Sequence, residues 1–507
     1  MSRRTRLALL LIGGALWGAV AAHAQTPPPA PTVFRFHLFK EPDSISPFEQ
    51  RNSNAGYLHA QLQAPLLRWQ KGALQPGTST GCRFTKSTEV RCGLRRELKF
   101  SDGSAVTPAD WRAHFEKIFD SRTKVRWAAD LFDVKGAEER FRGENVPLGV
   151  RAGKDEIIFE LKRPNREFLY RLTSPNLVPF RSTETGKSPH AQFVGTGAYR
   201  LKAWRPGVKF ELEKNPFSFE GHAERPSLEI LFVAEDSVAL KMYQSGELQF
   251  LRRLPTAFIE QARGKPDYFE IDQIRFDYFG FTKSFREKSE NRVLQEAMAL
   301  AFPYEEMRAL YNAKPRPGCF GLPSVLTAGP VCFDENPARA RELLRDRKVA
   351  PIPALFSQSV DDHRRALEWL QLQLEKRAGL KIRLDGRETK VFLDRLDARD
   401  ASFFRRGVAP DRPTCAAVLE NFLPGAAENY LDLDAKYLIE GVDRLLQEKS
   451  ETKKAKLCRE ILEKLRADYV MIPTGPIFFS ILARPEFTGW DLNELNQLDL
   501  KDLHVSK

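Results

Sequence analysis

The sequence predicts a mixed α/β protein built from two to four structural units, with two or three as the expected count. Its 507 residues exceed one small domain, because a domain usually holds roughly 100 to 200 residues. With 42% hydrophobic and 29% charged residues, the chain can bury a large core. An amphipathic helix over residues 364–377 is followed by an alternating strand from Leu380, and this succession is typical of an α/β unit.

The first 24 residues have the three parts of a secretory signal peptide. Arg3, Arg4 and Arg6 precede an apolar run over residues 7–22. Small residues flank His23, at the two positions that a signal peptidase recognises before its cleavage site. The run falls short of the roughly 20 apolar residues that a membrane-spanning helix needs. We therefore expect a cleaved signal peptide, residues 1–24, and a periplasmic location for the mature protein.

The chain is basic, with a formal net charge of +12, and loss of the three leader arginines leaves +9. A basic balance can indicate nucleic-acid binding, but export argues against that partner. A positive surface can instead favour anionic ligands or the anionic cell envelope. Net charge alone does not locate such a patch.

Periodicity predicts the elements of the mature chain in order. Strands are expected over residues 33–39, 155–161, 209–213 and 228–233. Thr107 is expected to cap a helix with Pro108 at its first position and an apolar face of Trp111, Phe115, Ile118 and Phe119. Further helices are expected around Leu240, over residues 291–301 and 364–377, and twice between residues 435 and 469. Helices and strands thus mix without a repeat.

Six cysteines in an exported chain make three disulfides plausible. Two pairs are close in sequence, and the third follows by elimination: Cys82 with Cys92, Cys319 with Cys332, and Cys415 with Cys458. Six cysteines allow fifteen connectivities, so spacing only ranks them. Buried free thiols remain the alternative for the last pair.

Several motifs resemble family 5 of the extracellular solute-binding proteins, which includes periplasmic dipeptide- and oligopeptide-binding proteins. The first is Leu-Lys-Phe-Ser-Asp-Gly at residues 98–103, followed by Thr-Pro-Ala-Asp at 107–110. Others are Gly-Thr-Gly-Ala-Tyr at 195–199, with Asn-Pro at 215–216, and Ser-Gly-Glu at 245–247. Counterparts of two family helices follow near residues 292–308 and 374–382. The resemblance spans nearly the whole mature chain.

The resemblance implies a two-lobed periplasmic binding protein fold, hinged on two crossing strands, with an extra subdomain in the first lobe. The first lobe would combine residues 25–68, 193–275 and 484–507, the extra subdomain would be residues 69–192, and the second lobe residues 276–483. The resemblance further implies a receptor that captures peptides or similar small solutes and delivers them to an inner-membrane ABC permease. We expect a monomer without catalytic residues, metal or cofactor.

The resemblance also suggests ligand-binding residues. Peptide-binding relatives hold the ligand amine with an aspartate in a Gly-Trp-x-x-Asp-Tyr segment, and residues 407–412 of this chain match its glycine and aspartate. Asp411 is the candidate anchor, within a segment that includes Arg405, Gly407, Val408 and Ala409. Pro410 lacks a backbone N–H, and Arg412 is placed to pair with Asp411 and neutralise it. Arg405 matches an arginine for the ligand carboxylate, and Ser46 and Phe48 resemble the ligand-facing edge of the first lobe.

Two other functions remain open at this level. An exported hydrolase would need an acid–base pair in the cleft, although no recognisable triad or metal-ligand spacing occurs in the sequence. A ligand-sensing accessory of a membrane receptor would bind the same solutes without importing them. Substrate turnover would favour the first, and capture of a sensor partner would favour the second.

Overall fold

The computed structural model describes residues 33–50, 53–182, 187–220, 224–310, 318–359 and 361–506. The predicted signal peptide and its cleavage site lie outside these ranges. In the described ranges, no helix combines the length and the apolar composition that a membrane span requires.

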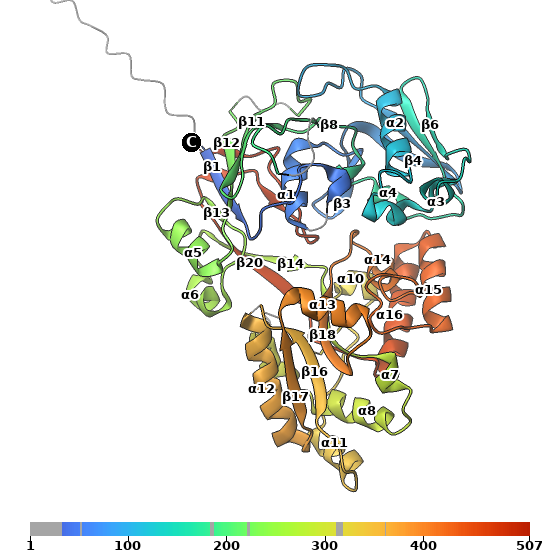
Figure 1. Ribbon diagram of the computed structural model, residues 1–507, viewed down its shortest axis with the longest axis vertical. Coiled ribbons are helices and arrows are strands. Elements are labelled where there is room, and N and C mark those ends of the chain that lie inside the picture. The colour runs from blue at the N-terminus through green and yellow to red at the C-terminus, as the bar shows by residue number, and fades with distance from the viewer. Residues whose placement is uncertain are drawn as a thin grey trace, which may run out of the picture. The chain divides into compact units, whose positions relative to one another are not determined.

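A seven-stranded mixed sheet gathers segments from the whole length of the chain. In spatial order its strands are β10 (Tyr199–Arg205), β11 (Lys209–Lys214), β12 (Ser227–Phe232), β1 (Val33–Leu38), β13 (Phe250–Leu251), β20 (Ile477–Ala483) and β14 (Tyr268–Gln273). β1 runs parallel to β12 and β13, and β20 lies antiparallel between β13 and β14. Figure 1 shows the blue β1 and the red β20 in this one sheet. The predicted strands at 33–39, 209–213 and 228–233 are confirmed.

A second sheet has five strands and carries most of the helices. Its order is β17 (Ile382–Arg387), β16 (Ile352–Ser357), β18 (Phe403–Val408), β15 (Phe276–Phe281) and β19 (Met471–Pro473). The helices of this part are α7 (Lys283–Arg286), α8 (Asn291–Ala301), α9 (Tyr304–Leu310), α10 (Ser324–Thr327), α11 (Pro337–Leu344), α12 (Asp361–Ala378), α13 (Thr389–Asp397), α14 (Cys415–Glu420), α15 (Lys436–Gln447) and α16 (Glu451–Ala467). The expected helix at 291–301 is confirmed with the same bounds, and those at 364–377 and 435–469 are confirmed with small shifts.

The chain passes between the two large sheets twice. Residues 274–275 connect β14 to β15, and residues 474–476 connect β19 to β20. Each crossing therefore joins a strand of one sheet almost directly to a strand of the other. Two short adjacent connections of this kind are suited to act as a hinge.

A third group of elements surrounds a four-stranded sheet with its own apolar core. The strand order is β4 (Ser79–Lys86), β5 (Glu89–Leu94), β7 (Glu156–Glu160) and β6 (Val150–Ala152). The core is covered by α2 (Pro108–Ile118), η2 (Arg126–Leu131), α3 (Ala137–Phe141), α4 (Phe168–Arg171) and η3 (Pro175–Leu177). Thr107 and Asp110 form a reciprocal capping box at the start of α2, and the predicted apolar face of this helix is buried.

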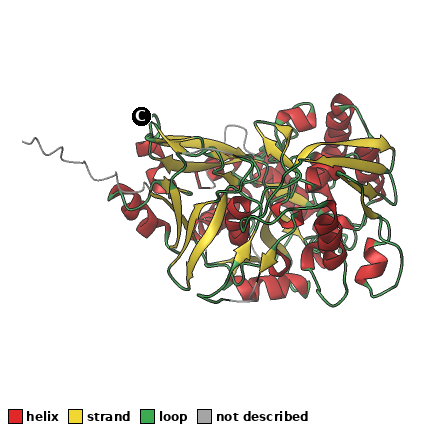
Figure 2. Ribbon diagram, turned by 90° about the horizontal axis from the view of Figure 1, so that it is seen from above, coloured by secondary structure: helices red, strands yellow, loops and turns green. Residues whose placement is uncertain are grey.

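Shorter elements complete the fold. They are η1 (Pro47–Glu49), α1 (Ser53–Leu62), α5 (Asp236–Gln244), η4 (Thr256–Phe258), α6 (Ile259–Ala262) and the strand pairs β2 (Leu67–Gln70) with β3 (Ala73–Pro76), β8 (Arg181–Ser182) with β9 (Phe193–Val194), β21 (Phe487–Thr488) with β24 (His504–Val505), and β22 (Asp491–Leu492) with β23 (Leu498–Asp499). Figure 2 shows helices and strands intermixed through the described residues, which confirms the α/β class.

All three predicted disulfides are present. Cys82 and Cys92 face each other on β4 and β5, and Cys319 and Cys332 form an isolated bridge. Cys415 at the start of α14 is bonded to Cys458 in α16, so the alternative of free thiols for this pair is wrong. This third bond ties together two helices that are separated by 43 residues of sequence.

Candidate functional site

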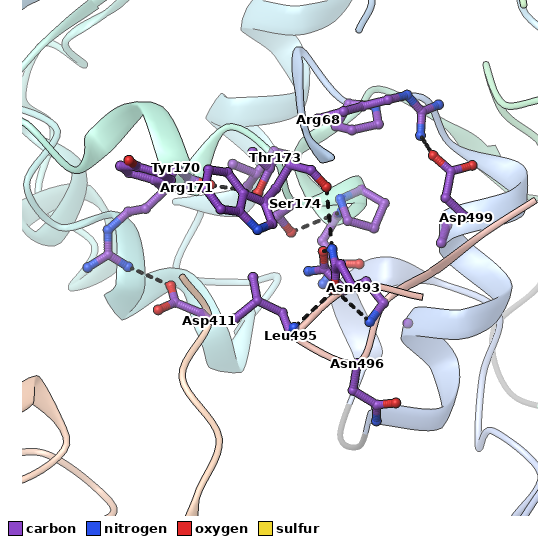
Figure 3. Close-up of a pocket in the computed structure, with 18 of the residues that line it drawn as sticks. Arg68, Tyr170, Arg171, Thr173, Ser174, Asp411, Asn493, Leu495, Asn496 and Asp499 are labelled. Atoms are coloured by element: carbon purple, nitrogen blue, oxygen red, sulfur yellow. Dashed lines mark hydrogen bonds and ion pairs between the residues drawn. The ribbon is translucent and has the colours of Figure 1, made fainter. Parts of the chain in front are cut away.

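A cavity of about 620 Å³ lies where residues from both large parts of the fold meet. One wall comes from α1, β2, η2, the 170–177 segment and the β22–β23 hairpin, and the opposite wall comes from Arg275 and residues 409–411. Its volume falls in the range of about 300 to 1,000 Å³ that is typical of small-molecule sites. Figure 3 labels ten of the lining residues that it draws, with Asp411 and Arg171 on one side and Arg68 and Asp499 on the other.

The β22–β23 hairpin supplies a fixed row of amide side chains. The Asn493 Oδ1 accepts the backbone N–H groups of Leu495 and Gln497, both at 3.0 Å. Asn496 has a φ of 59° and accepts a hydrogen bond from the Tyr57 hydroxyl through its side chain. Asparagine tolerates this left-handed conformation better than most residues. The turn therefore presents several amide groups to the cavity without a separate supporting element.

Arg68 secures this hairpin to the rest of the first wall. Its guanidinium donates to Asp499 Oδ2 at 2.7 Å and pairs with Glu220 at 2.7 Å, and its side chain is only 9% exposed. Burial raises the pKa of Glu220, while the Arg68 charge opposes that rise. The three groups form a buried ion cluster at one end of the cavity.

Aromatic side chains form the apolar part of the lining. The Trp69 indole N–H donates to Glu494 at 2.8 Å, and its ring packs against Tyr170 with the centroids 5.6 Å apart. The Trp127 indole N–H donates to the Pro47 carbonyl at 3.0 Å. All three rings line the cavity. Such walls accept varied side chains, because aromatic faces make little demand on hydrogen-bond geometry.

Asp411 follows β18 and lines the cavity, with 47% of its side chain exposed. Its Oδ2 accepts hydrogen bonds from Arg171 at 3.3 Å and from Arg412 at 3.1 Å. The pairing with Arg412 was expected from the sequence, and the contact with Arg171 of α4 was not. Asp411 therefore sits between two cations, one from each wall.

Arg412 is the centre of a buried network that crosses between the two walls. Its guanidinium contacts Glu167 at 3.3 Å as well as Glu420, and the side chains of Arg412 and Glu167 are each 1% exposed. The Thr414 hydroxyl donates to the same Glu167 oxygen at 2.7 Å. Burial raises the pKa of Glu167, and the nearby guanidinium opposes that rise.

The remaining residues of the predicted segment lie within the second sheet. Arg405 is buried on β18 and pairs with Asp277, which also accepts a 2.8 Å hydrogen bond from Arg275. Gly407 lies opposite Asp277 in the β15–β18 register, and a Cβ there would lie 2.0 Å from Asp277 Oδ1. Val408 is buried. Ala409 and Asp411 line the cavity, as does Arg275, which the sequence did not single out.

Ser46 and Phe48 belong to the segment around η1 and are both buried. The Phe48 ring stacks on His114 with centroids 5.1 Å apart, and packs against Phe180 at 4.9 Å. This places Phe48 in the core of the β4–β7 sheet region. The residue between them, Pro47, is the one that orients Trp127 in the cavity wall.

A buried histidine supports two polar residues of the wall. His59 Nδ1 lies 3.2 Å from the Gln50 Oε1 and 3.1 Å from the Asn176 Oδ1, and its Nε2 lies 3.0 Å from the Ile45 carbonyl. Burial lowers the pKa of His59 to about 4, so the ring is neutral at physiological pH. Across the described ranges, no group of three or more His, Cys, Asp or Glu side chains is arranged to hold a metal ion.

The comparison with known families identifies the chain over most of its length. Residues 85–430 match the model of the bacterial extracellular solute-binding proteins, family 5. The dipeptide-binding protein DppE of Bacillus subtilis is 23% identical over 406 residues, which cover 75% of this chain and 74% of that protein. The oligopeptide-binding protein OppA of the same organism is 22% identical over 481 residues, 88% of this chain and 87% of that protein.

Solved structures share the fold. The murein tripeptide binding protein MppA of Escherichia coli has a TM-score of 0.79 at 18% identity, covering 94% of this chain and 99% of that one. OppA of Haemophilus influenzae, in complex with the peptide RPPGFSPFR, has a TM-score of 0.76 at 18% identity with the same coverage. The fold of these proteins is two-lobed, as the sequence predicted, and the predicted export agrees with an extracellular family. The chain belongs to family 5 of the bacterial extracellular solute-binding proteins.

Proposed function

We propose that this protein is the exported receptor of an ABC-type importer, and that it captures peptides or similar small solutes between its lobes. The observation that carries the proposal is the 620 Å³ cavity, whose walls come from both large sheets in a chain of a solute-binding family. The names of the relatives DppE and OppA support peptides as the ligand class. The receptor works in the periplasm as a monomer without catalysis, and hands its ligand to an inner-membrane permease.

We propose the domain division that the resemblance implied. The first lobe combines residues 25–68, 193–275 and 484–507, the extra subdomain is 69–192, and the second lobe is 276–483. The two crossings at residues 274–275 and 474–476 are the hinge. The first supports the boundary after residue 275, whereas the second argues for ending the second lobe near residue 476 instead of residue 483. β20 follows the second crossing and pairs with β13 and β14, so residues 477–483 join the first lobe in the hydrogen-bonded sheet.

Closure would use contacts that already cross between the extra subdomain and the second lobe. The Arg166 backbone N–H donates to the Leu446 carbonyl at 2.8 Å, and Arg163 pairs with Asp443 at 2.7 Å. The buried Arg412 and Glu167 pair lies deeper on the same side. A ligand that touches both walls adds to these contacts only in the closed form, and therefore shifts the population toward closure.

Asp411 is the proposed anchor for the ligand's primary amine. Among the described residues, the contacts of its carboxylate all engage Oδ2, which leaves Oδ1 for the ligand. The ligand's carboxylate needs a cation, and Arg275 lines the cavity. Arg275 and Arg405 both pair with Asp277. We assign the contact with the ligand carboxylate to Arg275, with Arg405 behind it. The amide row of the β22–β23 hairpin can pair with the peptide main chain.

Native mass spectrometry of gently purified protein tests the ligand class directly. We expect a co-purified mass that corresponds to a peptide, bound once per chain and released intact on unfolding. Small-angle scattering should show a smaller radius of gyration when that peptide is added back to stripped protein. Chemical conversion of the ligand by the purified protein, or an unchanged radius at saturation, would overturn the proposal.

The Asp411→Asn variant tests the anchor. Removing one member of a desolvated charge pair typically costs about 2 to 5 kcal/mol, so the variant should bind a peptide with a free amine roughly 30-fold or more weakly by titration calorimetry. The N-acetylated form of that peptide should bind the unchanged protein poorly. Asp400→Asn is the matched control, because it removes an exposed carboxylate of the second lobe that pairs with Arg395. Equal affinity of both peptide forms would assign Asp411 a purely structural role.

A further inference from the structure

Trp127 and Asp130 lie three residues apart on the 3-10 helix η2, and both line the cavity. In a 3-10 helix, side chains at positions i and i+3 lie above one another on the same face. The Trp127 indole is held in place by its hydrogen bond to the Pro47 carbonyl. The extra subdomain thus places an oriented aromatic ring and a carboxylate side by side in the cavity wall.

Asp130 differs from Asp411 in its surroundings. Among the described residues, no hydrogen bond or ion pair reaches the Asp130 carboxylate, and its side chain is accessible from the cavity. The charged groups near it are Arg171 from α4, Asp411 and Arg412 from the loop after β18, and Glu420 from α14. Both guanidinium groups are already bonded to other carboxylates of this group.

The charge of this wall is therefore unbalanced. Two guanidinium groups, those of Arg171 and Arg412, face three carboxylates, those of Asp130, Asp411 and Glu420. Partial burial raises the pKa of Asp130, the Arg171 and Arg412 guanidinium groups oppose that rise, and the Asp411 and Glu420 carboxylates add to it. A cation supplied from outside would balance the charge of this wall.

We propose that Trp127 and Asp130 form a subsite for a positively charged side chain of the ligand, separate from the amine anchor at Asp411. An ammonium or guanidinium group placed there gains an ion pair and contact with an aromatic face. This inference rests on the proposed function and names its ligand class, namely peptides with a lysine or arginine close to the amino terminus. The receptor is selective for basic ligands although its own net charge is positive.

Titration calorimetry with a tetra-alanine series tests the subsite. Each peptide carries lysine, or its neutral isostere norleucine, at one position at a time. At one position we expect lysine to bind about tenfold or more tightly than norleucine, and Asp130→Asn to abolish this difference while leaving the norleucine peptide within about threefold. Asp155→Asn is the control, because it removes an exposed carboxylate of the same subdomain that pairs with Arg96. Trp127→Leu should reduce the lysine preference in part.

The outcomes separate this inference from the proposed function. If none of the peptides binds, the peptide receptor proposal fails. If the peptides bind and lysine is nowhere preferred, or if the preference survives Asp130→Asn, the receptor function stands and the subsite is overturned.

A second measurement does not depend on the ligand. An acid whose pKa is raised by folding destabilises the folded state when ionised, fully above the raised pKa and not at all below its ordinary value. Ligand-free Asp130→Asn should therefore melt above the unchanged protein at pH 8, and the gap should close as the pH falls toward about 4. A variant that melts lower at pH 8 would show that Asp130 is satisfied by the protein itself, which would overturn the subsite.

Discussion

Arg68 and Arg412 are two buried arginines that share the same chemistry and differ in what they connect. Each pairs with more than one carboxylate, and their side chains are 9% and 1% exposed. Arg68 joins β2 to Asp499 of the β22–β23 hairpin and to Glu220, all within the proposed first lobe. Arg412 extends from the loop after β18 to Glu167, on the opposite wall.

The comparison shows that the location of an ion pair relative to the hinge decides what the pair controls. A buried pair within one lobe is excluded from water in both the open and the closed form, so breaking it lowers the free energy of unfolding. A buried pair across the cleft can gain water when the lobes separate, so breaking it affects closure first. Leaving a buried carboxylate without its cation thus lowers the free energy of unfolding when the pair lies within one lobe. It shifts the equilibrium toward the open form when the pair spans the cleft.

The largest effect on unfolding is expected for Arg68→Met. The substitution leaves Glu220 and Asp499 buried without their cation, and the lobe has no open form in which they hydrate. We expect a loss of about 3 to 5 kcal/mol in the free energy of unfolding, measured by urea denaturation. Arg200→Met, which breaks a surface pair with Glu213, should change it by less than about 1 kcal/mol. Equal losses of unfolding free energy for Arg68→Met and Arg200→Met would show that burial of the Arg68 cluster does not control stability.

Arg412→Met should affect ligand binding more than unfolding. Glu167 is then buried without its cation in the closed form, whereas water can hydrate it in the open form, so the open form becomes favoured. Peptide affinity should fall about tenfold or more, and the radius of gyration without ligand should rise. Adding Glu167→Gln should restore part of the affinity, because it removes the uncompensated charge. No recovery in the double variant would indicate that Arg412 acts through Asp411 or Glu420 instead.

A disulfide in the extra subdomain should affect stability alone. Replacing Cys82 and Cys92 together with serine opens a short loop between β4 and β5, and should lower the free energy of unfolding by about 2 to 3 kcal/mol. Peptide affinity should remain within about threefold, since the bond lies away from the cavity lining. Non-reducing peptide mapping of the unchanged protein is the direct check, and alkylatable thiols at both positions would exclude the bond.

The smallest effect is expected for Arg163→Gln, which removes an exposed pair across the cleft. Arg163 and Asp443 are 2.7 Å apart, but their side chains are 54% and 42% exposed. Exposed pairs contribute about 0.2 to 1 kcal/mol and are screened by salt. Peptide affinity should therefore fall less than about fivefold at low salt, and the difference should disappear in 0.5 M salt. A salt-independent loss as large as that of Arg412→Met would show that burial does not separate the two pairs.

Local elements of the fold were predictable because their signals are local. Thr107 and Pro108 determine where α2 begins, and the apolar spacing of α8 and α12 follows from short stretches of sequence. The disulfides were predictable from export and from spacing. These features need no knowledge of which distant segments meet.

The cavity was only partly predictable for the opposite reason. Asp411 and Ala409 were identified through a family motif, but Arg412 meets Glu167 across 245 residues of sequence and Arg68 meets Asp499 across 431. Trp127 and Asp130 carry no motif, and they become notable only once η2 faces the cavity. A single sequence gives no signal for such contacts, because each partner on its own resembles an ordinary surface residue.

The position of β20 has a consequence for how the protein is made. β20 is the only strand among the described residues that pairs with both β13 and β14, and it begins at Ile477. A chain that emerges from a translocation channel amino terminus first therefore cannot complete this sheet until almost all of it has crossed the membrane. Such long-range pairing forms late and slowly. The order of the strands thus makes completion of the seven-stranded sheet one of the last steps in the folding of the exported chain.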